Sequence, residues 1–289
     1  MALRLATRGS KLALAQAGAV AEMLGGVELV EATSDGEPGD KSRFVRGVET
    51  AILEAEVDLG VHSAKDLPGE IPAGLVLAGV PGREDPRDAF IGEAASLAEL
   101  AQGGRIGTSS LRRRSQLLAL RPDLEIAELR GNVDTRLEKL AGGDYDGIVL
   151  AAAGLARLGR DGEAAFAFGL DELTPSPGQG TLALEARADD ADATAAAGRI
   201  TDRAALVELT AERAAAAALG GSCETPIGVC ARFEDGELVV RGYAGLPDGS
   251  EWVRDRVAGD PDQPAALGEA LAQRMLATGA AEILARVAA

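Results

Sequence analysis

Short apolar runs alternate with helical patterns over the first half of the chain, and this alternation restricts the fold more than any other feature. At the start, Leu3–Thr7 is typical of a buried strand, Arg8-Gly9-Ser10 of a turn, and Lys11–Leu24 of a helix that ends at Gly25-Gly26. A strand at Val27–Thr33, a helix near Val45–Glu56 and a strand at Asp58–His62 continue the pattern. This order predicts an α/β protein with a mainly parallel sheet covered by helices.

Two segments rich in proline and glycine divide this pattern. Pro81–Pro86 is polar and bounded by proline, which is typical of a hinge, and Pro175–Gly180 precedes a strand at Thr181–Glu185. Between them lie strands at Arg105–Thr108, Leu124–Leu129 and Gly147–Ala151, each of which enters a helix. We expect Thr181–Glu185 to return to the first sheet. One α/β domain would then contain residues 1–82 and 181–200, and a second would contain residues 86–175.

The pattern changes after about residue 203. An alanine-rich helix at Asp202–Leu219 leads through Gly220-Gly221 to strands, with hairpin signals at Glu234–Gly236 and Pro247–Gly249 and a closing helix at Pro264–Val287. Residues 203–289 are therefore expected to form a small α+β domain. The whole chain is predicted to be two α/β domains joined by a hinge, followed by this third domain.

The charge balance excludes several classes of partner. Acidic residues outnumber basic ones 46 to 29, which gives a formal net charge of −17 and argues against a nucleic-acid or anionic-membrane surface. This acidic, lysine-poor composition suggests a protein of a salty cytoplasm, in which repulsion between surface charges is screened. No membrane-length apolar run or signal peptide is present, so we expect a cytoplasmic protein. Two cysteines are too few for a disulfide framework and do not have zinc-site spacing.

Three consecutive arginines follow Gly107-Thr108-Ser109-Ser110-Leu111 at a predicted helix start, with Ser109 or Ser110 as the N-cap. The helix dipole is already positive at this end, so each arginine in the first turn costs about 0.3–1 kcal/mol unless an anion compensates. An anionic ligand would explain Arg112 and Arg113. Arg114 is assigned to the surface, because side chains of adjacent helical residues diverge by about 100°.

Other arginines also follow predicted strands: Arg8, Arg130 and Arg157, while Arg136 lies four residues after the likely N-cap Asn132. Ligands of open α/β sheets bind at the carboxyl ends of the strands, so these arginines indicate a ligand with several carboxylates or phosphates. The alternative is that they pair with the many surface carboxylates. A Walker-type loop and a dinucleotide fingerprint are absent, which disfavours nucleotides.

Several motifs in series resemble those of the porphobilinogen deaminase family. They are Ala6–Ser10, Val61–Pro68, Arg83–Phe90, Gly107–Arg113, Leu129–Val133, Gly178–Gly180 and Cys223–Gly228. The resemblance covers nearly the whole chain in the expected order. It implies two domains of the type II periplasmic-binding-protein kind, a third domain that carries a cysteine, and head-to-tail condensation of four porphobilinogen molecules into 1-hydroxymethylbilane, with release of ammonia.

The resemblance also implies a covalent dipyrromethane cofactor, attached through a thioether to Cys223, and no metal. Its carboxylates would be held by Arg112, Arg113 and Arg136 with Lys65, Thr108 and Ser110. Incoming porphobilinogen would be bound by Arg8, Ser10, Arg130 and Arg157. Guanidinium groups suit this work because they bind carboxylates bidentately. We expect a monomer that acts on this small molecule.

Asp66 is the candidate catalytic residue, because loss of ammonia builds positive charge on a pyrrole ring that a carboxylate would stabilise. The alternative is that Asp66 caps a turn or pairs with Lys65. Cys230 lies in an apolar strand pattern and is expected to be buried and inert, and His62, the only histidine, is expected to be a positioning residue.

Two other functions remain open: a binding protein whose lobes close on a small carboxylate, and a different enzyme that acts on an anionic metabolite without a bound cofactor. Either would explain the hinge and the arginines. The binding protein would leave Cys223 without a role and would more often carry an export signal. A covalent adduct of two pyrrole units on Cys223 would exclude both.

Overall fold

The structure is a computed structural model that describes residues 2–32, 43–221 and 225–288. By their internal contacts they form two compact units. The first contains Met1–Glu84 and Gly180–Leu206, and the second contains Asp85–Gln179 and Val207–Ala289. The chain passes from one unit to the other at three points. Among the helices of the described ranges, none is both long enough and apolar enough to span a membrane.

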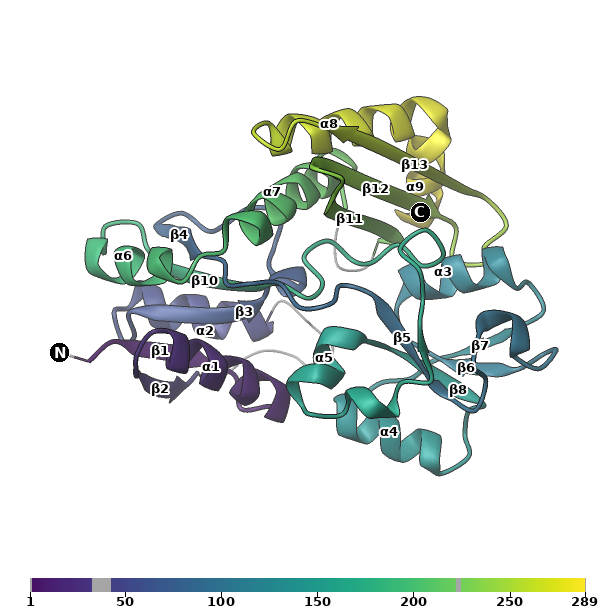
Figure 1. The fold of residues 1–289 in the computed structure, drawn as a ribbon, viewed down its shortest axis with the longest axis horizontal. Helices are drawn as coiled ribbons and strands as arrows, with labels where there is room; N and C mark the ends of the chain where they lie inside the picture. Colours follow the sequence, from purple (N-terminus) through teal and green to yellow (C-terminus); the bar gives the residue numbers. More distant parts are fainter. Residues whose placement is uncertain (1, 33–42, 222–224, 289) are drawn as a thin grey trace. The chain divides into compact units, whose positions relative to one another are not determined.

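Five strands form the sheet of the first unit, in the order β2-β1-β3-β10-β4 (Figure 1). They are β1 (Arg4–Thr7), β2 (Glu28–Glu31), β3 (Leu59–Ser63), β4 (Leu75–Gly79) and β10 (Leu182–Arg187). β1 is parallel to β2 and β3, whereas β10 is antiparallel to β3 and β4. The strand predicted at Thr181–Glu185 therefore does return to the first sheet.

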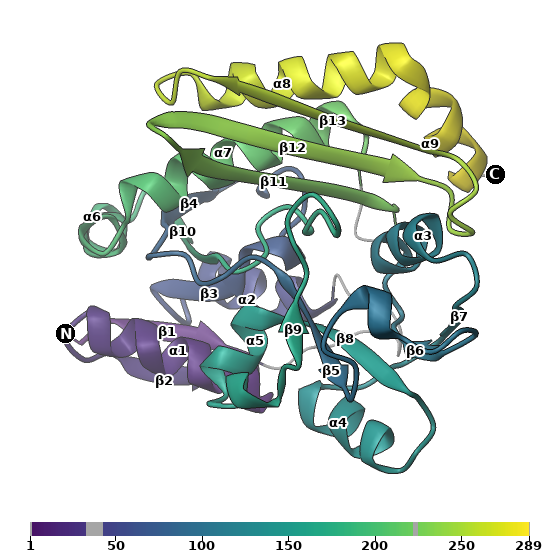
Figure 2. The same cartoon turned by 45° about the vertical axis from the view of Figure 1, so that its right-hand side comes forward.

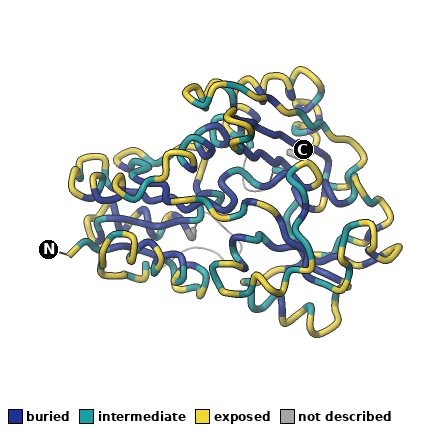
Figure 3. Tube along the Cα trace, in the orientation of Figure 1, coloured by how far each residue is buried: buried dark blue, intermediate teal, exposed yellow. Residues whose placement is uncertain are grey.

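Helices cover both faces of this sheet, because successive side chains of a strand point to opposite faces. Leu5 packs with α1 (Lys11–Met23) and α6 (Ala191–Arg199) on one face. The next residue, Ala6, packs with α2 (Arg43–Leu53) on the other. The central strands β3 and β10 are accordingly buried along most of their length, whereas the edge strand β2 is largely exposed (Figure 3).

The second unit contains a sheet of matching design, in the order β7-β6-β8-β5-β9. Its strands are β5 (Asp88–Gly92), β6 (Arg105–Gly107), β7 (Glu125–Ala127), β8 (Gly147–Ala151) and β9 (Phe166–Ala167). β6 is parallel to β7 and β8, and β5 is antiparallel to β8 and β9. Leu117 of α3 (Leu111–Leu120) packs on one face, and α4 (Val133–Ala141) and α5 (Ala152–Arg157) contribute to the core on the other.

A three-stranded antiparallel sheet completes the second unit (Figure 2). It contains β11 (Ile227–Glu234), β12 (Glu237–Gly245) and β13 (Trp252–Gly259). One face packs with α7 (Arg203–Ala218) and α8 (Pro264–Met275) through an apolar core. Both predicted hairpins are present: Asp235 and Gly236 have φ of 50° and 90°, as a tight hairpin turn requires, and Gly249 has φ of 72°. The fold is thus two α/β parts of the type II periplasmic-binding-protein kind and a small α+β part.

Some sequence expectations were wrong in detail. The closing helix predicted at Pro264–Val287 is interrupted: α8 ends at Met275, a π-turn follows at Leu276–Ala280, and α9 begins at Ala281 and ends at Ala288. Gly279, with φ of 112°, leaves the helical region there. The strands β4, β5 and β9 were not predicted, because they do not show a clear alternation. The three-domain boundaries stay a prediction, since the contacts resolve two units.

Candidate functional site

The predicted site residues of the first unit follow the carboxyl ends of parallel strands. Arg8 and Ser10 follow β1, and Ser10 caps α1 by accepting a hydrogen bond from the Ala13 N–H at 3.3 Å. Lys65 and Asp66 follow β3 and lie in a single 3₁₀ turn, Ala64–Asp66. Asp66 is exposed and Lys65 is half-buried. The position expected for ligands in an open α/β sheet is therefore occupied by these residues.

In the second unit, the predicted residues follow β6, β7 and β8. Ser110, rather than Ser109, is the N-cap of α3: its hydroxyl accepts from the Arg113 N–H at 3.4 Å, while the Thr108 hydroxyl accepts from the Ser110 N–H at 3.2 Å. Asn132 caps α4, as predicted, by accepting from the Thr135 N–H at 2.9 Å. These caps fix the first turn of each helix, from which the arginine side chains project.

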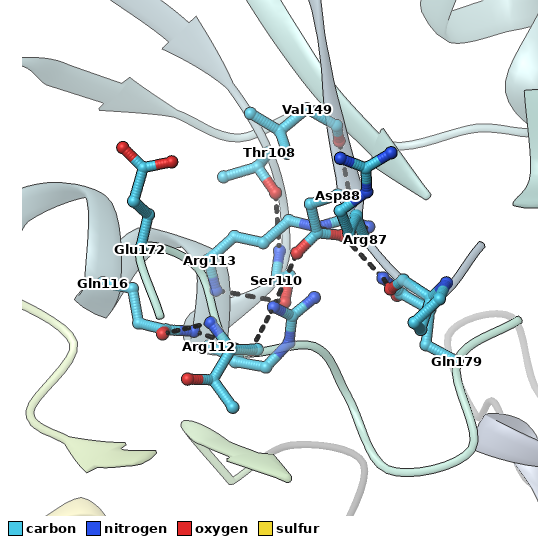
Figure 4. Close-up of polar contacts among 12 residues, drawn as sticks. Arg87, Asp88, Thr108, Ser110, Arg112, Arg113, Gln116, Val149, Glu172 and Gln179 are labelled. Carbon is cyan, nitrogen blue, oxygen red and sulfur yellow. Dashed lines mark hydrogen bonds and ion pairs between the residues drawn. The ribbon is translucent and has the colours of Figure 1, made fainter. Parts of the chain in front are cut away.

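Arg112 and Arg113 converge on one buried carboxylate, that of Asp88 at the start of β5 (Figure 4). Arg112 Nη1 donates to Asp88 Oδ2 at 2.7 Å, and Arg113 Nη2 and Nε donate to Asp88 Oδ1 at 2.7 and 3.0 Å. Asp88 is 0% exposed, and the two arginines are 4% and 6% exposed. The protein itself therefore supplies part of the negative charge that we expected at this helix start.

The charges of this cluster do not balance. Burial alone would raise the pKa of Asp88, but the charges of Arg112 and Arg113 and their hydrogen bonds outweigh burial and hold that pKa well below its usual range. The pKa of Arg113 is lowered, first by burial, and the charge of Arg112 adds to this against the opposing effect of Asp88. Two buried guanidinium groups thus share one carboxylate, which leaves an excess positive charge.

Arg136 increases this excess. Burial lowers its pKa to about 10, and the nearby charge of Arg113 contributes to the same shift. Its Nε donates to the Gly131 carbonyl at 2.8 Å. Among the described residues no carboxylate lies within ion-pair distance of Arg136, and Arg112 Nε and Nη2 have no acceptor. The cluster therefore offers unused donors and excess charge to an anion.

The segment Thr174–Gln179, which overlaps both the predicted break at Pro175–Gly180 and the motif Gly178–Gly180, supports this cluster. The Thr174 carbonyl accepts from Arg112 Nη1 at 2.9 Å and from Gln116 Nε2 at 3.0 Å. Gln179 Nε2 donates to Asp88 Oδ1 at 2.9 Å (Figure 4). It also donates to the Pro86 carbonyl at 2.7 Å. Both ends of this segment therefore hydrogen-bond to the cluster, Thr174 with Arg112 and Gln179 with Asp88.

A buried glutamate connects the same segment to β11. The Glu212 side chain, in α7, is 0% exposed and accepts from the Gly178 N–H at 2.6 Å and from the Ala231 N–H at 2.7 Å. The Val229 N–H donates to the Pro175 carbonyl at 2.9 Å. β11 begins at Ile227, four residues after Cys223, so these bonds fix the strand that follows the cysteine relative to the arginine cluster. Cys223 itself lies outside the described residues.

The remaining predicted residues are more accessible. Arg130 is exposed, and its Nε lies 2.7 Å from Glu128 Oε1, a surface pair of small energetic value. Arg157 is half-buried at the end of α5. Arg114 is exposed, as predicted, and donates to the Pro247 carbonyl at 3.2 Å.

Sequence reasoning missed Asp88, Gln179 and Glu212 as parts of this arrangement. Asp88 and Gln179 lie in the motifs Arg83–Phe90 and Gly178–Gly180, which carried the resemblance but gave neither residue a role. A further signal for Asp88 was its position at the start of the apolar run Ala89–Ile91, because a carboxylate next to a buried strand needs a partner. Cys230 is buried, as expected. Within the described ranges, no group of three or more His, Cys, Asp or Glu side chains is arranged to hold a metal ion.

Comparisons with known proteins match nearly the whole chain. Residues 3–195 match the family model "Porphobilinogen deaminase, dipyromethane cofactor binding domain", and residues 206–277 match "Porphobilinogen deaminase, C-terminal domain". A porphobilinogen deaminase of Roseiflexus sp. strain RS-1 is 46% identical over 98% of both chains, and one of Thermus thermophilus is 44% identical over 97% of both. A periplasmic solute binding protein from Desulfovibrio salexigens covers 69% of this chain and 72% of its own at 11% identity and a TM-score of 0.41, too remote for an argument.

Proposed function

This chain belongs to the porphobilinogen deaminase family, and on that premise we propose how its residues divide the work of making hydroxymethylbilane from porphobilinogen. The reaction joins four porphobilinogen molecules head to tail, releases ammonia at each condensation, and ends with hydrolytic release of the product. It is a transferase reaction of tetrapyrrole biosynthesis. The observation that carries our proposal is the excess positive charge around Arg112, Arg113 and Arg136.

The donor set fits a dipyrromethane cofactor. Each pyrrole unit has an acetate and a propionate group, and the cluster has three guanidinium groups against one carboxylate, with Arg112 Nε and Nη2 lacking an acceptor within the described ranges. Arg112, Arg113 and Arg136 would hold the carboxylates, with Thr108, Ser110 and Lys65 as further donors, and Cys223 would carry the thioether. When bound, the cofactor supplies the primer to which the growing chain is attached.

Asp66 is proposed as the catalytic carboxylate. It is exposed at the end of β3, in a short turn that begins immediately after the strand. As ammonia leaves an aminomethylpyrrole, positive charge develops on the ring, and a fixed carboxylate stabilises that charge more in the transition state than in the ground state. The same group can accept a pyrrole proton and return it.

The arginines nearer to solvent are proposed to bind incoming porphobilinogen. Arg8, Ser10 and Arg130 follow the carboxyl ends of strands in their respective units, and Arg157 ends α5, the helix that follows β8. The exposure of Arg130, with only a surface partner, suits a side chain that must exchange its carboxylate partner during each cycle. We further propose that the enzyme works as a cytoplasmic monomer and binds neither nucleic acid nor membrane, which the net charge of −17 supports.

Intact mass and turnover test this division of roles. Purified protein should carry an adduct with the mass of two pyrrole units, which Cys223→Ala abolishes and Cys230→Ala retains. Asp66→Asn should fold and load the cofactor but lose about 100-fold or more in kcat. Glu70→Gln, which removes another exposed carboxylate of the same segment, serves as the matched control and should stay near the wild-type rate. An unmodified protein would favour a binding protein or a cofactor-free enzyme, and a near-normal rate for Asp66→Asn would refute the role of Asp66.

A further inference from the structure

A buried cluster of three titratable side chains in the first unit has no role in the chemistry described above. His62 lies in β3, Glu185 in β10 and Glu49 in α2, and their exposed fractions are 5%, 0% and 6%. His62 Nε2 lies 3.0 Å from Glu185 Oε2. Ionisable side chains are rarely buried so completely unless they are paired, so the cluster needs an explanation.

The strand pleat brings these groups together. Gly60 lies two residues before His62 and directly opposite Glu185 in the β3–β10 pair, so all three positions share the sheet face that α2 covers. A Cβ at position 60 would lie 2.4 Å from a Val48 methyl group and 3.4 Å from His62 Nε2. The absence of a side chain at Gly60 therefore lets Val48 of α2 approach the sheet beside the imidazole.

His62 Nε2 and Glu185 Oε2 lie within ion-pair distance, but their orientation does not meet the geometry of a hydrogen bond, and neither atom has a hydrogen-bond partner among the described residues. The contact is therefore a close approach of two buried polar groups. The pKa of Glu49 is raised, first by burial and then by the charge of Glu185, while His62 and Arg46 oppose this shift. Burial and the charge of Glu185 therefore favour the protonated form of Glu49, and Glu185 is the carboxylate that lies 3.0 Å from the imidazole.

The end of β3 is fixed from both faces immediately before the Asp66 turn. His62 is held on the α2 face, and the next residue, Ser63, accepts a hydrogen bond from Gln16 of α1 at 2.9 Å. The Ala64 N–H then donates to the Thr181 carbonyl at 2.9 Å. The 3₁₀ turn Ala64–Asp66 therefore starts from a backbone whose direction is set by these three contacts.

We propose that His62 is a positioning residue whose contact with Glu185 fixes the end of β3 and so holds Lys65 and Asp66 in the orientation that substrate requires. This inference rests on the catalytic role proposed above for Asp66. It assigns a function in the reaction to a histidine that does not touch substrate. The effect is expected in kcat, because the approach of Asp66 to the reacting ring changes while carboxylate binding by the arginines does not.

The first measurement is independent of activity. The chain has one histidine, so ¹⁵N-labelled histidine gives signals from His62 alone. In the cofactor-loaded wild-type enzyme at neutral pH we expect Nε2 to carry a hydrogen and its signal to move in Glu185→Gln, with a smaller change in Glu49→Gln. A wild-type Nε2 without a hydrogen would overturn the proposal, whatever the outcome for Asp66→Asn.

The second measurement separates positioning from simple stability. Rates are normalised to folded, cofactor-loaded protein. His62→Phe, which keeps a ring but has no donor, should lose at least tenfold in kcat with KM within twofold of wild type. His62→Gln, which places an amide N–H near the position of Nε2–H, should recover most of the rate, and the kcat of Glu49→Gln should stay within twofold of wild type.

Equal loss of kcat in His62→Phe and His62→Gln, or no loss in either, would overturn the proposal. If His62→Phe does not fold, the kcat of Glu185→Gln is compared with that of Glu49→Gln. Equal losses of kcat in these two variants would overturn the proposal.

Discussion

Replacing Asp88 by asparagine tests whether the arginine pair depends on one buried carboxylate. In the wild-type protein Asp88 Oδ2 accepts from Arg112 at 2.7 Å, and Oδ1 accepts from Arg113 at 2.7 and 3.0 Å and from Gln179 at 2.9 Å. Asparagine keeps one oxygen but places an NH₂ group against a guanidinium donor. Without the cofactor, it also leaves two buried positive charges that have no negative partner among the described residues.

Removing one partner of a buried ion pair costs about 3–5 kcal/mol, because the remaining charge stays desolvated. In domains of this size, 1 kcal/mol corresponds to roughly 2–4 °C in thermal midpoint, so Asp88→Asn should lower the midpoint by roughly 6–20 °C. Asp123→Asn is the matched control: Asp123 Oδ2 also lies 2.7 Å from an arginine, Arg121, but near the surface. This control should change the midpoint much less.

The acid dependence provides a second criterion. The pKa of Asp88 is lowered in the folded state, so its stabilising contribution is fully present above the pKa of an unfolded aspartate, about 4, and is lost as the pH falls through the folded value. The difference in midpoint between wild type and Asp88→Asn should be widest near neutral pH and should shrink below about pH 4. Thermal unfolding followed by circular dichroism measures both effects. A midpoint no lower than that of Asp123→Asn, or a difference that does not shrink in acid, would refute the reasoning.

Two further predictions concern the other arginines. Arg136→Met removes a charge that repels Arg113, so the cofactor-free Cys223→Ala background should be as stable as before or slightly more stable, whereas the loaded enzyme should lose part of the stability that the cofactor confers. Thermal midpoints of both forms check this, and an equal loss in the two forms would contradict it. Arg114→Ala removes an exposed side chain with one contact to Pro247, so kcat/KM should change less than twofold and stability by less than about 0.5 kcal/mol. Steady-state kinetics measures kcat/KM, and a tenfold loss in Arg114→Ala would show that Arg114 belongs to the site.

Local sequence signals anticipated the frame of the site. The hydroxyl residues before the arginine run predicted the start of α3, and Ser110 caps it. Asn132 caps α4 as expected. Residues that follow strands were correctly placed at the carboxyl ends of parallel strands, because strand and helix periodicities and N-cap chemistry act over only a few residues.

The partners of the buried charges were not predictable from the sequence. Gln179 and Asp88 are 91 positions apart, and Arg113 and Asp88 are 25 apart. With 46 acidic residues in the chain, no local rule selects Asp88 as the carboxylate for two arginines. The same holds for Glu212, which joins Gly178 to Ala231. Such pairs exist only when folding brings distant segments together.

The sequence by itself determined the succession of strands and helices, the helix starts, and the ordered motifs that identify the family. Only the tertiary structure decided that Arg112 and Arg113 share Asp88 and that His62 meets Glu185 under α2. The physical reason is the distance along the chain over which each interaction acts. Backbone preferences and caps are settled between neighbours along the chain, whereas a buried charge must find its compensation among whatever groups the packed interior places within about 3 Å.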